Sequence, residues 1–172
     1  CSSTKPSKRA LEFAFYTGDL TISRRDGMLK TYDLTDRHFG WEHPPRAATE
    51  KQVLDYLLDR ALRAQAIVSL DSICHLDAPR KPAMAARIES RRLVPVEIDG
   101  APGFWTTRAT AENLPGPSDA APVHILSPFD PLIILRKRLS RIFGYDHLFE
   151  AYVPAARRRL GYFALPVLVG DR

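Results

Sequence analysis

The chain has 172 residues, of which 45% are hydrophobic and 26% are charged. This composition is typical of a globular protein of one or two domains, and it excludes a disordered or low-complexity chain. The net charge of +5 favours a polyanionic partner.

Two cysteines, Cys1 and Cys74, are too few for a disulfide framework, and no spacing of cysteine and histidine is typical of a zinc site. No segment approaches the roughly 18 consecutive apolar residues of a membrane helix. We therefore expect a cytoplasmic protein with no membrane contact, no metal and no other cofactor.

Residues 1–48 are predicted to form the second half of a winged helix followed by a connector. Pro6 suits the first turn of a helix that Gly18 ends, and two short strands flank a tight turn at Asp26–Gly27. The inner side of that helix is predicted to comprise Leu11, Phe13, Ala14 and Phe15. A helix and a hairpin without earlier helices suggest that the chain starts in mid-domain.

Residues 49–113 are predicted to form a complete winged helix of three helices and a hairpin. Thr49 and Ser69 are suitable N-caps, Pro79 ends the second helix, and Pro82 begins the third. Strands on either side of residues 99–103 complete the pattern. The helical faces predicted to form the core comprise Val53, Leu54, Leu57, Leu58, Ala61, Leu62, Met84, Ala85 and Ile88.

Residues 114–172 are predicted to form a linker and a basic C-terminal module. Proline and glycine mark the linker over 113–122, a strand is expected at 123–126, and a helix at 131–143. A last strand at 162–169 has no evident partner, so the C-terminus is also expected to be truncated. The predicted fold class is α+β, with tandem winged-helix (helix-turn-helix) units followed by a small mixed α/β module.

Basic residues occupy the places where winged helices contact DNA, namely a helix start, the wing tip and the third helix. Others lie on the last helix and in a run of three arginines. The candidate DNA-binding residues are Lys8, Arg24, Arg25, Arg80, Lys81, Arg87, Arg91, Arg138, Arg157 and Arg158. The alternative for the hairpin tip and the third helix is a solvated surface. For the run of three arginines it is structural ion pairs with Asp130, Asp146 or Glu150.

The sequence offers no catalytic residues and no metal ligands. None of the five histidines has the spacing of a metal site, and a partly buried structural role is expected for His75. No nucleophile elbow and no phosphate-binding glycine loop occurs. Asp130 precedes Pro131, so it is expected to cap a helix, the alternative being a catalytic carboxylate.

Several sequence blocks in a fixed order support a family resemblance. They are ALEF at 10–13, YTGDLTISRR at 16–25, YDLT at 32–35, SPFD at 127–130, RKRL at 136–139, FGYD at 143–146, YVPA at 152–155 and GDR at 170–172. With these blocks the chain resembles the bacterial winged-helix DNA glycosylases of the AlkZ/YcaQ type. The resemblance implies a nucleoid-associated protein that binds double-stranded DNA and hydrolyses the N-glycosidic bond of alkylated or crosslinked bases without a metal.

The resemblance also implies a catalytic Gln-x-Gln or Gln-x-Asp motif in an N-terminal winged helix. The only glutamines here, Gln52 and Gln65, are followed two positions later by Leu54 and Ile67. We therefore expect the chain to be the DNA-binding portion of such an enzyme, inactive by itself. The alternative is a non-enzymatic winged-helix protein such as a transcriptional regulator.

Overall fold

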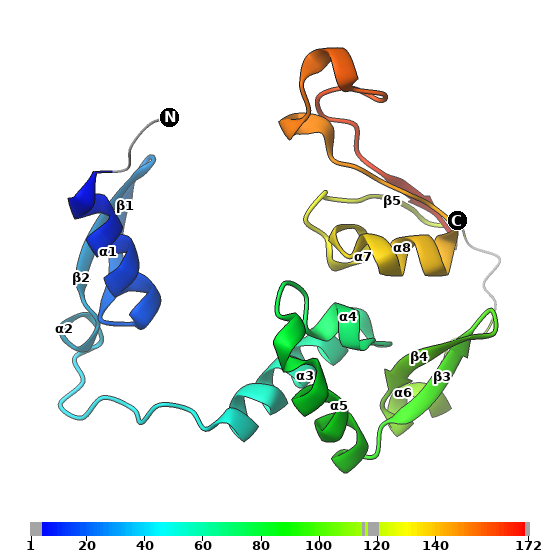
Figure 1. Cartoon of the computed structure of the whole chain (residues 1–172), viewed down its shortest axis with the longest axis horizontal. Helices are drawn as coiled ribbons and strands as arrows, with labels where there is room; N and C mark the ends of the chain where they lie inside the picture. Colours follow the sequence, from blue (N-terminus) through cyan, green and yellow to red (C-terminus); the bar gives the residue numbers. More distant parts are fainter. Residues whose placement is uncertain (1–4, 115, 117–120, 171–172) are drawn as a thin grey trace. The chain divides into compact units, whose positions relative to one another are not determined.

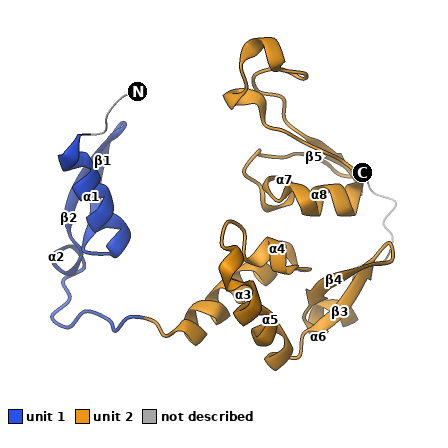
Figure 2. Cartoon of the chain, in the orientation of Figure 1, with its two compact units in different colours: residues 1–47 blue, residues 48–172 orange. Residues whose placement is uncertain are grey.

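The computed structural model of the chain describes residues 5–114, 116 and 121–170. It divides into two compact units, residues 1–47 and 48–172, which are described separately here (Figure 2). Each combines helices with two-stranded antiparallel sheets, so the predicted mixture of helices and small antiparallel sheets is confirmed. A further boundary near residue 113 stays a prediction, and residues 115 and 117–120 of the predicted linker lie outside the described residues.

The first unit is a helix packed against a hairpin (Figure 1). Its elements are α1 (Pro6–Thr17), β1 (Leu20–Asp26), β2 (Leu29–Leu34) and the short helix α2 (Thr35–Phe39). The rings of Phe15 and Tyr32 meet edge to face, with centroids 6.1 Å apart, and hold α1 to β2. Leu11 is 41% exposed and Phe13 is 70% exposed, which corrects their predicted inner positions. Two helical residues lie about 200° apart around the axis, so Phe13 points away when Phe15 faces the hairpin.

The β1–β2 hairpin has a two-residue loop, Gly27–Met28, closed by the pair Asp26 and Leu29. Gly27 has a φ of 54°, a conformation that glycine adopts without strain. Further from the loop the register shifts between Ile22 and Arg24, where β1 holds one extra residue. Such a bulge increases the twist of the hairpin.

The second unit begins with helices and a second hairpin. The elements are α3 (Glu50–Gln65), α4 (Leu70–Ile73), the 3-10 turn η1 (Ala78–Arg80), α5 (Lys81–Ser90), β3 (Val94–Ile98), β4 (Ala101–Thr106) and α6 (Arg108–Glu112). The predicted caps are confirmed: the side chains of Thr49 and Ser69 accept the backbone N–H groups of Gln52 and Ser72. Helix α4 is shorter than predicted, and α6 was not predicted.

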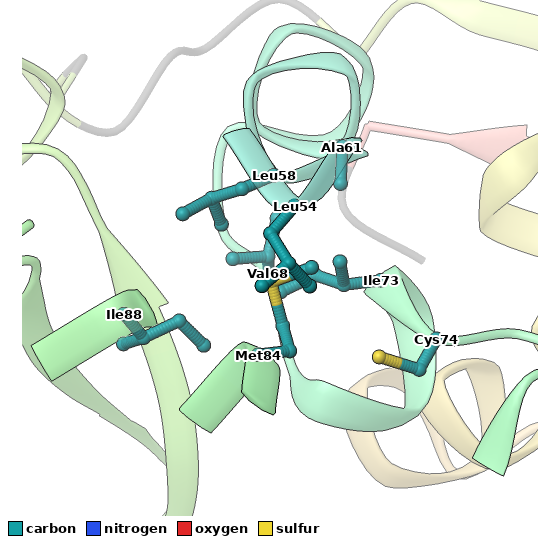
Figure 3. Packing of buried hydrophobic residues seen from close by; sticks show 8 residues of the cluster. All are labelled: Leu54, Leu58, Ala61, Val68, Ile73, Cys74, Met84 and Ile88. Atoms are coloured by element: carbon teal, nitrogen blue, oxygen red, sulfur yellow. The ribbon is translucent and has the colours of Figure 1, made fainter. Parts of the chain in front are cut away.

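Buried residues of α3, α4 and α5 form one hydrophobic core around Val68 (Figure 3). The cluster comprises Leu54, Leu58, Ala61, Val68, Ile73, Cys74, Met84 and Ile88. Val68 exchanges two backbone hydrogen bonds of 2.8 Å with Trp105, which ties the second hairpin to the helices. Of the core residues predicted for the first and third helices of residues 49–113, only Ala85 is exposed, and Ala83 packs against the cluster in its place.

The C-terminal part differs most from its prediction. Its elements are β5 (Val123–Ile125), α7 (Pro131–Ile134), α8 (Arg136–Phe143), the 3-10 turns η2 (Glu150–Tyr152) and η3 (Ala155–Arg157), and β6 (Val167–Val169). The single helix predicted for 131–143 is broken at Leu135, which has φ −86° and ψ 65°. In one continuous helix Ile133 and Leu135 would point in nearly opposite directions, whereas the break lets both be buried.

The last strand pairs antiparallel with β5, His124 lying opposite Leu168. The prediction that this strand needs a partner from outside the chain is therefore wrong. It is also shorter than predicted, because the backbone of residues 162–166 runs outside any ladder. Among the described helices, none combines the length and apolar character that a membrane crossing needs.

Candidate nucleic-acid interface

The β1–β2 hairpin presents three exposed cations behind its loop. Arg25 lies directly opposite Lys30, and Arg24 lies opposite Thr31. None of the three basic side chains makes an ion pair or a side-chain hydrogen bond within the parts of the chain that the structure describes. Like charges directly opposite each other destabilise an antiparallel pair. The hairpin therefore carries a local repulsion that a bound polyanion would relieve.

Lys30 was not among the predicted DNA-binding residues. The signal for it was present, because a two-residue loop at Gly27–Met28 places Arg25 and Lys30 opposite each other. The predicted turn at Asp26–Gly27 lies one residue too early, because a loop there would place Arg25 opposite Met28 instead of Lys30. Lys8, the other candidate in this unit, faces Glu12 one helical turn later at 3.7 Å. Both side chains are exposed, so this pair contributes little and leaves Lys8 accessible.

The predicted recognition helix α5 has cations that are paired within the protein. The guanidinium of Arg87 donates to both oxygens of Asp55 on α3, at 2.6 and 2.7 Å. Arg91 bridges Asp55 and Asp59 at 3.1 and 2.9 Å. Bidentate pairs of this kind are among the strongest ion pairs at protein surfaces. They hold α5 against α3.

The start of α5 shows the same pattern. Arg80 pairs with Asp77 at 3.0 Å, and the ammonium of Lys81 pairs with Asp71. Hydrogen bonding to Lys81 holds the pKa of Asp71 below its ordinary value. All four predicted α5-region cations thus have carboxylate partners, whereas the alternative expected for them from the sequence was a solvated helix face. Their contact with DNA stays a prediction.

Replacing Asp55 with Asn is expected to flatten the acid dependence of stability. Hydrogen bonds from Arg87 hold the pKa of Asp55 below its ordinary value, so folding favours the ionised form. The stabilisation is complete above the unfolded pKa of about 3.9 and is lost as the pH falls through the lower folded value. Urea midpoints measured from neutral to strongly acidic pH should differ between the two proteins at neutral pH and converge in acid. A constant difference would contradict this assignment.

Arg138 on α8 lies in the interior, contrary to the prediction of a surface DNA contact. It is 8% exposed, and its Nη1 donates to the backbone oxygen of Ile67 at 2.6 Å. Burial without a carboxylate lowers its pKa. The break at Leu135 changes which residues of α8 face inward, and this rotation places Arg138 between α8 and the segment after α3. On the same helix Arg136, Lys137 and Arg141 are exposed.

The run of three arginines forms a turn shaped by Glu150. The carboxylate of Glu150 accepts the backbone N–H groups of Arg159, Leu160 and Gly161 at 2.7 to 3.0 Å. These bonds lower the pKa of Glu150. The expected alternative involved the arginine side chains, but in the structure the backbone amides are the partners.

The two predicted DNA-binding residues of this turn, Arg157 and Arg158, differ in their exposure to solvent. Arg157 is exposed, whereas Arg158 is half-buried. The Nε of Arg158 donates to the oxygen of Val153 at 2.8 Å, and its guanidinium lies 4.9 Å from the ring centroid of Tyr162. Arg158 therefore has an internal role, and Arg157 is the more available of the two for a phosphate.

The remaining polar candidates have local structural roles. Asp130 accepts the N–H of Leu132 at 2.8 Å, so its predicted capping role is confirmed. Gln52 completes the cap of α3 through its Oε1. The Oε1 of Gln65 is buried and has no partner within residues 5–114, 116 and 121–170. His75 follows α4 and is exposed, which corrects the expected partial burial. In the described portion of the chain no three metal-binding side chains gather at one point.

Comparison with known families gives one result that covers nearly the whole chain. The family model described as DNA glycosylase AlkZ-like matches residues 2–172. No solved structure matches the chain.

Proposed function

Because the chain belongs to the AlkZ-like DNA glycosylase family, a family of DNA-repair enzymes that act on DNA, we propose that it is the DNA-binding portion of such an enzyme. The proposed reaction of the whole enzyme is hydrolysis of the N-glycosidic bond of alkylated or interstrand-crosslinked bases. The observation that carries the DNA-binding role is the uncompensated cation pair Arg25 and Lys30 on an exposed hairpin. A double-stranded polyanion is the partner that removes this repulsion.

The order of elements supports winged-helix architecture in both units. Residues 49–113 run through helix, bridge, helix, helix and hairpin, with Val68 paired to β4 of the hairpin by an isolated antiparallel bridge. Residues 6–34 contain a helix followed by a hairpin. In winged helices the hairpin is the wing, which contacts the DNA backbone or the minor groove. Under this proposal β1–β2 is a wing.

We propose that neither glutamine of this chain takes part in hydrolysis of the glycosidic bond. The family motif needs a second polar residue two positions after a glutamine, where Gln52 and Gln65 have Leu54 and Ile67. Gln52 is in addition engaged in the α3 cap. The role proposed for the described residues is therefore to hold DNA rather than to place the attacking water.

Replacing Arg25 and Lys30 together with Ala is expected to weaken binding of duplex DNA. Each lost phosphate contact should lower the slope of log K against log salt by about 0.9, and affinity at low salt should fall by roughly tenfold. Fluorescence anisotropy of a labelled duplex over a salt series measures both. The matched control is Lys51→Ala with Arg108→Ala, which removes two exposed positive charges from the second unit.

If the control loses as much affinity, the loss depends only on the net charge of the chain, and a specific role for the hairpin is contradicted. A duplex that carries an alkylated purine should bind at least as well as an undamaged one. Strong preference for one base sequence, without regard to damage, would instead favour a regulator.

A further inference from the structure

The tip of the β1–β2 hairpin carries two exposed apolar side chains, one in the loop and one at the start of β2. Met28 is 95% exposed and Leu29 is 75% exposed. Loop tips usually carry glycine, asparagine, aspartate or serine, which serve the turn geometry and remain hydrated. Gly27 alone meets the backbone requirement of this turn, so the geometry does not call for Met28. Neighbouring exposed apolar groups are typical of surfaces that contact a partner.

The cations lie at a defined distance behind this apolar tip. Arg25 and Lys30 form the pair next to the closing pair of the loop, Arg25 two residues before Gly27 and Lys30 two residues after Met28. At roughly 3.3 Å per residue this spacing is about 7 Å. The minor groove of B-DNA is about 7.5 Å deep, with phosphates along both rims. A tip at the floor of this groove would place both cations at the level of the phosphates.

We propose that Met28 and Leu29 insert between neighbouring base pairs from the minor groove, while Arg24, Arg25 and Lys30 contact the flanking phosphates. The inference rests on the DNA-binding function proposed above and specifies how one hairpin engages the duplex. Apolar side chains that enter a base step unstack it and kink the duplex, at a cost that the surrounding backbone contacts offset. Asp26, opposite Leu29, would then face base edges rather than phosphates.

The charge pattern favours DNA over the other partner of a cationic apolar tip, an anionic membrane surface. A wedge with cations on both faces fits a groove bounded by two rows of phosphates. The strand alternation places Arg24 on one face of the hairpin and Arg25 with Lys30 on the other. A hairpin lying on a lipid surface would contact it through one of its two faces. Cations on both faces of the hairpin therefore favour a DNA groove as the binding site.

The test uses duplexes with 2-aminopurine at successive positions, because the fluorescence of this base rises when it is unstacked. Binding of the 172-residue chain should raise the signal at one step or a few adjacent steps. The double variant Met28→Ser with Leu29→Ser should abolish the rise and weaken binding by about tenfold, while the salt slope stays unchanged. Met28→Leu should retain the rise, since it keeps an apolar tip. The matched control, Leu76→Ser, removes an equally exposed apolar side chain from the second unit and should have no effect.

Retention of the fluorescence rise in the double variant would overturn the wedge. So would duplex binding without any rise, which would leave the DNA-binding function itself intact. Failure of the unaltered chain to bind duplex would contradict the proposed function as well. Vesicles containing phosphatidylserine form the last arm of the test. Binding to them that depends on Met28, with no 2-aminopurine signal, would assign the tip to membranes and overturn the proposal.

Discussion

Replacing Arg138 with Ala is expected to lower the free energy of unfolding of the second unit by about 2–4 kcal/mol. The guanidinium supplies the hydrogen bond of 2.6 Å to the carbonyl oxygen of Ile67, and its stem fills space beneath α8. The Ala variant loses the packing and leaves that oxygen without its donor. An unsatisfied buried acceptor costs more than the net worth of the bond.

Met at the same position is expected to be less destabilising than Ala. The Nε of Arg138 is buried and has no hydrogen-bond partner among the residues that the structure describes, so the charged group has a desolvation cost that its bond to Ile67 only partly offsets. Met retains most of the packing and removes the charge. If Met and Ala prove equally destabilising, the packing of the stem is not the main contribution.

Urea unfolding followed by the fluorescence of Trp105 measures these changes. Trp41 lies in the first unit, where it stacks on Phe39, so a Trp41→Phe background leaves Trp105 as the only reporter. Arg136→Ala is the matched control, since Arg136 is exposed on the same helix. It should change stability by less than about 0.5 kcal/mol. An equally small effect of Arg138→Ala would show that Arg138 is on the surface in solution.

The second large effect is expected at Phe104, where Ala should cost about 3–5 kcal/mol. Phe104 is 1% exposed on β4, and the guanidinium of Arg141 on α8 lies 5.4 Å from its ring centroid. The substitution removes a ring that connects the second hairpin to the C-terminal part, and it leaves a cavity. Stability should fall mainly through the cavity, because Arg141 is exposed and the cation–π contact contributes little.

The same urea experiment tests Phe104, with Tyr56→Ala as the control. Tyr56 is an exposed aromatic residue on α3, so its removal deletes a similar side chain without a cavity. Arg141→Ala separates the two contributions and should cost less than about 1 kcal/mol. A loss in Arg141→Ala as large as that in Phe104→Ala would place the main contribution in the cation–π contact.

Local signals in the sequence predicted much of the fold. The caps at Thr49, Ser69 and Asp130 depend on a side chain and the backbone two or three residues later, and all three are confirmed. The end of α1 at Gly18 depends on one left-handed glycine. The core of α3 follows from a regular spacing of apolar residues. Interactions between residues so close in the sequence can be predicted from local patterns.

Contacts between residues distant in the sequence could not be predicted. Arg87 lies 32 positions from Asp55, and Arg138 lies 71 positions from Ile67, so no local pattern distinguished them from free surface cations. The break at Leu135 also depends on tertiary packing, because each half of 131–143 has a reasonable helical sequence. The candidate interface in the structure therefore differs from the predicted one. The cations of α5 are paired with carboxylates, Arg138 is buried, and Lys30 joins Arg24 and Arg25 on the first hairpin.

Glu150 has a consequence for how the three-arginine turn can meet a ligand. Three successive backbone N–H groups converging on one point form the concave anion site that proteins often use for phosphate. Here a carboxylate of the chain itself occupies that position, as an internal substitute for the phosphate oxygen. The turn is thereby kept in shape before any ligand arrives. Its main-chain amides are already satisfied, so only the side chain of an exposed residue such as Arg157 is left to recognise a phosphate from outside.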